Sequence, residues 1–318
     1  MNKIEHMHHL FFLLLSVLLV PGSPLSAQKQ IAITMDDPNT YETPLMGWEK
    51  RNDAILKTLN KHHIQAALFV CGMRVNDANG ARLIKAWDDN QHLICNHTFS
   101  HLYYNGQENE VFFQDFQKGD SLIRSYKNYT KLFRFPFLKE GDSDEKRDTM
   151  RAVLEKNGYK NGYVTIDASD WYIDSKIEEV LKKDPKANLD VYKQFYIQHI
   201  LDRINYYDSL AQILFKRDVK HTLLIHHSLL NALFLDDLLT ALKANNCQLI
   251  DAREAYTDAL GNLQPRVLPC GESIIWQCAK LDSTLAPTLR YPGEDSEYEE
   301  KPLQQMIEKT ARLNSGKH

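Results

Sequence analysis

The feature that most constrains the fold is an alternation of short apolar runs with segments of helix length. The runs have the length and branched or aromatic content of buried strands, and the segments between them suit amphipathic helices. Seven runs follow one another, at residues 31–34, 66–70, 93–95, 132–137, 162–166, 222–225 and 247–250. Helices are expected at about residues 48–61, 81–90, 111–129, 145–156, 197–214 and 235–245. This order predicts an α/β fold with βα units around a mainly parallel sheet or barrel.

Ionisable residues stand at or near the ends of five of these runs. They are Asp36 and Asp37, His97 and His101, Arg134, Asp167 and Asp170, and His226. Each stretch alone has an ordinary interpretation as a solvated turn. Because the carboxyl ends of parallel strands share one face of a barrel or open sheet, these side chains are expected to converge there. The shared position favours one common site over five independent turns.

His97 and His101 are four residues apart, a spacing at which two imidazoles can bind one metal ion. Thr98 stands where the helical metalloprotease motif has a Glu, so a base and a third ligand must come from elsewhere. Asp36 and Asp37 are a candidate source. Adjacent carboxylates raise each other's pKa unless a cation lies near, so the pair indicates either a solvated turn or a site. Arg134 inside an apolar run likewise calls for a carboxylate partner.

Composition and the first residues bear on the class of protein. The 318 residues, 43% of them hydrophobic, suffice for one large domain or two ordinary ones. A formal net charge of -4 without a basic cluster argues against a nucleic-acid partner.

Lys3 precedes an apolar run at 10–20 that is short for a membrane span, and small residues follow at 21–27. Residues 1–27 are therefore predicted to be a signal peptide, with export to the periplasm or the medium and no membrane span after its removal. An uncleaved anchor is the alternative.

Export permits disulfides, but five cysteines cannot all pair within the chain. Cys71 and Cys95 end apolar runs and are expected to be buried small side chains. Cys270 and Cys278 are close enough in sequence to bridge a local loop, and the sequence leaves open whether they do. Cys247 would then stay free.

Taken together, the five stretches resemble the motifs of the polysaccharide deacetylase family, which is carbohydrate esterase family four with its NodB homology domain. Asp36-Asp37 resembles the family motif T-F-D-D, and residues 97–101 resemble H-[ST]-x-x-H. Residues 134–137 resemble R-x-P-Y, residues 167–171 resemble D-x-x-D-W, and residues 224–226 resemble L-x-H. The similarity covers residues 31–255 in order and spacing. It implies a distorted (β/α)7-type barrel. We accordingly expect a catalytic domain at 28–260 and a C-terminal extension at 261–318 that packs on the barrel and is partly mobile.

The resemblance also implies roles for individual residues. Asp37, His97 and His101 would hold a divalent metal, with Zn²⁺ expected and Co²⁺ or Ni²⁺ as alternatives. Asp36 would be the general base for a metal-bound water, held ionised by Arg134, and His226 the general acid, oriented by Asp170. The backbone N–H of Phe137 would assist the oxyanion, and Trp171 would wall the acetyl methyl. His227 is the alternative acid, and Asp167 has a structural interpretation as a turn cap.

Some residues depart from the family pattern. Met35 replaces an aromatic residue, Pro38 replaces a Gly, and Phe137 lacks the hydroxyl of the usual Tyr. The favoured hypothesis is an N-deacetylase of amino-sugar polymers or oligomers, such as envelope glycan, exopolysaccharide or chitin-like chains, with an acetylated glycan as partner. The alternatives are an O-acetyl esterase or an amidase for non-peptide C–N bonds that uses the same site. An inactive glycan-binding module is a third interpretation.

Overall fold

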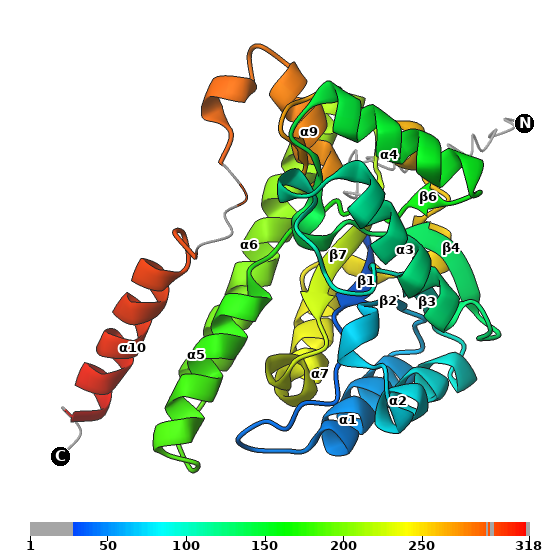
Figure 1. The fold of residues 1–318 in the computed structure, drawn as a ribbon. Helices are drawn as coiled ribbons and strands as arrows, with labels where there is room; N and C mark the ends of the chain where they lie inside the picture. The colour runs from blue at the N-terminus through cyan, green and yellow to red at the C-terminus, as the bar shows by residue number, and fades with distance from the viewer. Residues whose placement is uncertain (1–27, 291, 293–295, 316–318) are drawn as a thin grey trace, which may run out of the picture.

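The centre of the molecule is a curled parallel sheet (Figure 1). The computed structural model describes residues 28–290, 292 and 296–315, so the predicted signal peptide lies outside the described residues. The sheet strands are β1 (Lys29–Asp36), β2 (Ala67–Val70), β3 (Leu93–Asn96), β4 (Tyr129–Phe133), β6 (Lys160–Asn161), β7 (Lys220–His226) and β8 (Cys247–Leu249). Their order is β6-β4-β3-β2-β1-β7, and β8 pairs with the start of β1. All these pairs are parallel, which brings the strand ends to one face.

The sheet curls back on itself through the segment that follows β6. Gly162 donates its N–H to the carbonyl of Phe133 in β4 at 2.7 Å, and Ile166 forms a parallel bridge with Leu223 in β7. Between them the Thr222 hydroxyl donates to the carbonyl oxygen of Tyr163 at 2.9 Å. The predicted regular strand at 162–166 is therefore wrong in detail, because side-chain hydroxyls take over part of the ladder here. The α/β fold and the distorted barrel are confirmed.

Helices cover the outer face of the sheet (Figure 1). They are α1 (Trp48–Lys61), α2 (Ala78–Asp89), α3 (Asn109–Ile123), α4 (Asp144–Lys156), α5 (Asp170–Lys183), α6 (Asp190–Phe215) and α7 (Leu229–Ala244). The short helix α8 (Ala252–Ala255) packs instead against the inner face, beside Ala32 and Ala67. Short 3₁₀ turns are η1 (Gly72–Arg74), η2 (Tyr104–Gly106), η3 (Pro136–Leu138), η4 (Ala259–Asn262) and η5 (Ala286–Thr288). The predicted helix at 111–129 ends earlier than expected, because Asp88 accepts the N–H groups of Lys127 and Asn128 and turns the chain into β4. The helix α5 was not predicted.

The main core lies between the sheet and these helices. Ile31, Ile33 and Met35 of β1 are fully buried there. The predicted amphipathic face of α6 supplies Ile200 and Ile204, also buried. Burial of such side chains is the main stabilising contribution to the fold, at about 25 cal/mol per Å² of apolar surface. Among the helices of the described ranges, none has the length and apolar character needed to cross a bilayer.

The C-terminal part adds a strand and two helices. β9 (Cys270–Gly271) pairs antiparallel with β5 (Lys139–Gly141), and α9 (Ile274–Leu281) buries three residues in the main core, Ile274, Ile275 and Trp276. The helix α10 (Glu300–Ser315) contacts α6 at the edge of the molecule (Figure 1). Within the extension, mobility was expected at residues 291–297, and 291 and 293–295 lie outside the described residues.

The disulfide that the sequence left open does not form. Both Cys270 and Cys278 are free thiols, and so are Cys71, Cys95 and Cys247. The Sγ atom of Cys270 faces the Oε1 atom of Gln277 at 3.4 Å. Cys278 is the next residue of α9, about 100° further round the helix, so its side chain points in another direction.

Candidate active site

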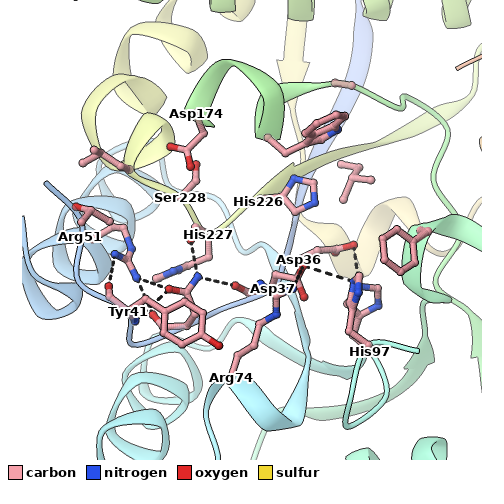
Figure 2. A pocket seen from close by; sticks show the side chains of 18 of the residues that line it. Asp36, Asp37, Tyr41, Arg51, Arg74, His97, Asp174, His226, His227 and Ser228 are labelled. Carbon is pink, nitrogen blue, oxygen red and sulfur yellow. Dashed lines mark hydrogen bonds and ion pairs between the residues drawn. The ribbon is translucent and has the colours of Figure 1, made fainter. Parts of the chain in front are cut away.

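A cavity of about 600 Å³ opens at the carboxyl ends of the strands. The sequence-predicted residues that line it are Asp36, Asp37, His97, His101, Phe137, Asp167, Trp171, His226 and the alternative acid His227. Two others, Arg134 and Asp170, lie buried behind its wall, 1% and 0% exposed. The structure thus brings together residues from strand ends that are far apart in the sequence. Figure 2 shows His226 and His97 on different sides of the Asp36–Asp37 pair.

Asp37, His97 and His101 form a compact group of candidate metal ligands. One ligand atom from each lies within 4.8 Å of the other two. The Nδ1 atom of His97 lies 2.8 Å from the carbonyl oxygen of Arg134, to which it donates when protonated, and this leaves Nε2 as the ligand atom. The Oδ1 atom of Asp37 is buried and has no hydrogen-bond partner. A buried carboxylate oxygen without a partner beside two imidazoles fits a bound divalent cation.

The charge states of the three side chains suit that role. Burial lowers the pKa of both His97 and His101 to about 4, so both rings are neutral at pH 7 and can offer a lone pair. Burial alone would raise the pKa of Asp37, but His101, His97 and Arg74 together lower it. One anionic oxygen and two neutral nitrogens are a donor set that Zn²⁺ accepts.

The loop that carries the two histidines is held by polar side chains. Asn96 accepts the N–H of Thr98 at 2.9 Å, and Asp115 accepts the N–H groups of Phe99 and Ser100. Thr98 and His101 both have left-handed backbone, with φ of 63° and 55°. Such strain persists only where the surroundings fix it, and here these bonds do so. Asn96 therefore holds the turn that aims the ligands.

Asp36 is paired with a buried arginine. The Oδ1 atom of Asp36 accepts a bond from Arg134 Nη1 at 2.6 Å. Arg134 also donates to the hydroxyl of Thr34, the carbonyl of Gly162 and the hydroxyl of Tyr256. Burial raises the pKa of Asp36 to about 6, against the opposing charge of Arg134. The carboxylate is mainly ionised at pH 7, yet close enough to neutrality to take a proton.

On the other side of the cavity His226 is bonded to Asp170. The Nδ1 atom of His226 lies 2.8 Å from Asp170 Oδ1, and the backbone N–H of His226 donates to Oδ2. Asp170 is the first residue of α5, where the helix dipole favours a negative charge. Burial by itself lowers the pKa of His226, but Asp170 overrides it and raises the pKa to about 9. The ring is protonated at pH 7, with Nε2–H as the proton to donate.

The alternation of side chains along β7 separates His226 from His227. Asp36 and His226 are register partners at the ends of β1 and β7. His227 lies 3.2 Å from Asn52 of α1, is 1% exposed, and has its pKa lowered by burial to about 3. His227 also lines the cavity, but its ring is neutral and bonds to Asn52, so the arrangement favours His226 as the candidate acid.

Residues 25–162 match the family model described as polysaccharide deacetylase. Over these residues, a little under half of its length, the chain is similar to the polysaccharide deacetylase family. A peptidoglycan N-acetylglucosamine deacetylase of Bacillus cereus is 31% identical over 110 residues, which are 34% of this chain and 46% of that protein. The match thus spans less than half of the relative's length.

Solved structures of the family have a similar fold. The polysaccharide deacetylase Bc1974 from Bacillus cereus aligns with a TM-score of 0.51 and 19% identity, over 70% of this chain and 92% of that chain. A CE4 family pseudoenzyme from Bacillus anthracis aligns with a TM-score of 0.49 and 17% identity, over 72% and 65%. At 19% identity the likeness to Bc1974 establishes the fold alone.

Phe137 and Trp171 stand at the cavity where the family pattern implies oxyanion and methyl contacts. Phe137 has left-handed backbone, with φ of 55°, and its ring packs against that of His101 at 4.6 Å between centroids. Trp171 is 36% exposed and lines the cavity. The ring of Phe137 thus lies next to a candidate ligand, and Trp171 presents apolar surface to the same cavity.

Several site residues were missed by sequence reasoning. Asn231 donates to Asp170 Oδ2 at 2.9 Å, and Arg74 lies 3.4 Å from Asp37. Tyr256 binds Arg134, and Glu272 lines the cavity from the C-terminal part. None of these four follows a predicted strand within a family motif, so no pattern signalled them. Their role follows only from packing between distant segments.

Proposed function

We propose that this protein is a metal-dependent hydrolase that removes N-acetyl groups from amino-sugar polymers or oligomers outside the cytoplasm. One observation carries the proposal. An ionisable carboxylate, Asp36, and a protonated imidazole, His226, line the same cavity as the Asp37, His97 and His101 group. A base, an acid and a cation site in one cavity are what amide hydrolysis requires.

Asp37, His97 and His101 would hold a divalent cation, with Zn²⁺ proposed. When bound, the cation supplies positive charge that polarises the acetyl carbonyl and acidifies water. Asp36 takes a proton from the attacking water, and Arg134 keeps the carboxylate aimed. The water oxygen bonds to the carbonyl carbon, and the C–N bond breaks. The products are acetate and a free amine.

The leaving nitrogen needs a proton, and His226 is placed to give it. The Nδ1–H of His226 donates a hydrogen bond to Asp170. The proton on Nε2 of His226 therefore points away from Asp170 and toward the cavity. The Phe137 N–H donates to the acetyl oxygen as charge develops there, and Trp171 provides an apolar wall for the methyl group. Each of these contributions acts on the transition state of the same reaction.

The paired charges favour a hydrolase over an inactive binding module. Holding the Asp36–Arg134 pair out of water requires compensation for desolvation, since both side chains are at most 4% exposed. A glycan binder gains nothing from a buried base and an acid with a raised pKa. Their presence supports activity.

Acetate release from the purified protein tests the proposal. The panel is N-acetylglucosamine oligomers, peptidoglycan and acetylated xylan, each with Zn²⁺, Co²⁺, Ni²⁺ or a chelator. We expect acetate from an N-acetylated substrate and a loss of at least about a hundredfold in Asp36→Asn. Asp88→Asn is the control, because Asp88 holds a turn before β4 outside the cavity.

Three outcomes would contradict the proposal. Release from acetylated xylan alone would favour the O-acetyl esterase, and full activity with chelator or in Asp36→Asn would overturn the mechanism. Absence of release from every substrate in the panel would favour the binding module. N-terminal sequencing of the secreted protein tests export, with the mature chain expected to begin near residue 28.

A further inference from the structure

The C-terminal part of the chain reaches into the cavity at Glu272. This residue lines the cavity directly after β9, far outside the residues that match the family model. β9 pairs with β5, with Lys139 opposite Gly271. The N–H of Glu272 donates to the carbonyl of Leu138 at 3.0 Å. The segment is thus bonded to the residue that follows Phe137.

A buried ion pair reinforces this contact. Lys139 and Glu272 are joined through their side chains, each only 5% exposed. A buried charge left without its partner is strongly unfavourable, so the pair holds the two backbones at one separation. Gly271 allows the close approach. Its φ is 131°, and a Cβ there would overlap the carbonyl oxygen of Leu138.

The contact is made where the backbone of the site is strained. Phe137 and Leu138 both have φ of 55°, which is unfavourable for residues other than glycine. Two such residues in succession keep this conformation only if the surroundings fix it. On one side the ring of Phe137 packs on His101, and on the other Leu138 is bonded to Glu272.

The anchoring segment is itself fixed to the barrel. The Ser273 hydroxyl donates to the carbonyl of Thr165 at 2.7 Å, and the N–H of Ile274 donates to the carbonyl of Val164 at 2.8 Å. Both acceptors lie in the segment that closes the sheet onto β7. The strained turn is therefore tied through residues 271–274 to a rigid part of the barrel.

We propose that Glu272 is a positioning residue for the deacetylation, and that with Lys139 it fixes the turn at Phe137 so that the Phe137 N–H faces the acetyl oxygen in the transition state. The inference rests on the proposed function. The C-terminal part of the chain would then help to position the Phe137 N–H for the reaction, in addition to packing α9 on the core.

This role predicts which kinetic constant changes. The hydrogen bond to the acetyl oxygen strengthens as charge develops, so a loosened turn lowers kcat while leaving KM and metal affinity near their original values. A purely structural contact would instead lower thermal stability without selectively lowering kcat.

The experiment compares Glu272→Gln and Lys139→Met with Lys139→Arg, in full-length protein loaded with Zn²⁺. We expect kcat to fall about tenfold or more in the first two, with KM and Zn²⁺ affinity within about twofold, whereas Lys139→Arg keeps the ion pair and the rate. Asp258→Asn is the matched control. Its carboxylate, 5% exposed, pairs with Arg217 and accepts the N–H of Lys220 at the opposite end of β7.

Hydrogen–deuterium exchange on the same variants gives a measure that needs no substrate. Amides of residues 135–141 are expected to exchange faster in Glu272→Gln and Lys139→Met, and at the original rate in Lys139→Arg and Asp258→Asn. Unchanged exchange and kcat in Glu272→Gln would overturn the proposal, as would an equal loss of kcat in Asp258→Asn. Were the unaltered protein inactive on all substrates, the proposed function would fail, and the exchange rates alone would decide whether Glu272 fixes the turn.

Discussion

Histidine side chains have opposite pKa shifts on the two sides of the cavity. On the metal side burial lowers the pKa of His97 and His101 to about 4, and on the acid side Asp170 raises that of His226 to about 9. Carboxylates lie 3.6 Å from His97 and 3.5 Å from His101, but of the three rings only that of His226 is hydrogen-bonded to one. His97 is bonded to a neutral carbonyl, whereas His226 is bonded to a buried carboxylate. A carbonyl leaves a lone pair for a cation, and a carboxylate stabilises an imidazolium.

The largest expected effect comes from the metal side. His101→Ala removes one of three ligands, so we expect loss of bound Zn²⁺ and a fall in acetate release of about a thousandfold or more. A chelator should do the same to the unaltered protein, and added Zn²⁺ should restore it. Metal content by mass spectrometry is the check. Stoichiometric Zn²⁺ in His101→Ala would remove this residue from the ligand set.

The acid side should respond differently. His226→Ala removes the proton donor, so kcat is expected to fall by about a hundredfold or more while Zn²⁺ content stays the same. His227→Asn serves as the control, because His227 lines the same cavity but its ring bonds to Asn52 and not to Asp170. If His227→Asn lost as much activity with its fold intact, the assignment of the acid would be reversed.

A smaller change tests the cause of the raised pKa. Asp170→Asn keeps the shape but removes the negative charge that stabilises the His226 imidazolium. The pKa of His226 should fall from about 9, so the alkaline limb of kcat/KM moves to lower pH. The loss of rate at pH 7 should be about tenfold to a hundredfold. NMR titration of His226 measures the shift, and an unmoved titration would show that Asp170 is not its cause.

The smallest expected effect is on the pH dependence of the free energy of unfolding, and it concerns His92, a histidine outside the cavity. His92 is fully buried and its Nδ1 accepts the N–H of Ala66 at 3.0 Å, and burial lowers its pKa to about 4. The folded pKa lies below the unfolded value of about 6.5, so this stabilisation is complete above pH 6.5 and is lost as the pH falls toward 4. The slope is about 1.4 kcal/mol per pH unit for one proton.

The variant His92→Asn keeps an acceptor and cannot be protonated. Urea unfolding of both proteins between pH 7 and pH 4 should therefore show a shallower loss of unfolding free energy in the variant. Parallel curves would mean that His92 is not protonated on unfolding in this range.

Local sequence signals predicted some parts of the molecule well. The helix expected at 48–61 is α1, and β2, β3, β7 and β8 lie within a few residues of the predicted runs. These segments have a hydrophobic period that matches their structure. The signals failed at 162–166, where threonine hydroxyls replace ladder bonds, and at α5, whose first residue was interpreted only as part of a motif. Neither effect leaves a periodic pattern.

The order of apolar runs predicted a parallel α/β sheet or barrel, and the family resemblance implied the distorted barrel. The residues at the ends of the runs indicated that Asp37, His97, His101, Asp36 and His226 would meet. This was so because parallel strands bring their carboxyl ends to one face. Only the tertiary structure decided the charge state of each histidine and the partners Asn231, Tyr256 and Glu272. A pKa depends on burial and on charges within a few ångströms, and those neighbours come from segments as far apart in the sequence as Asp36 and His226.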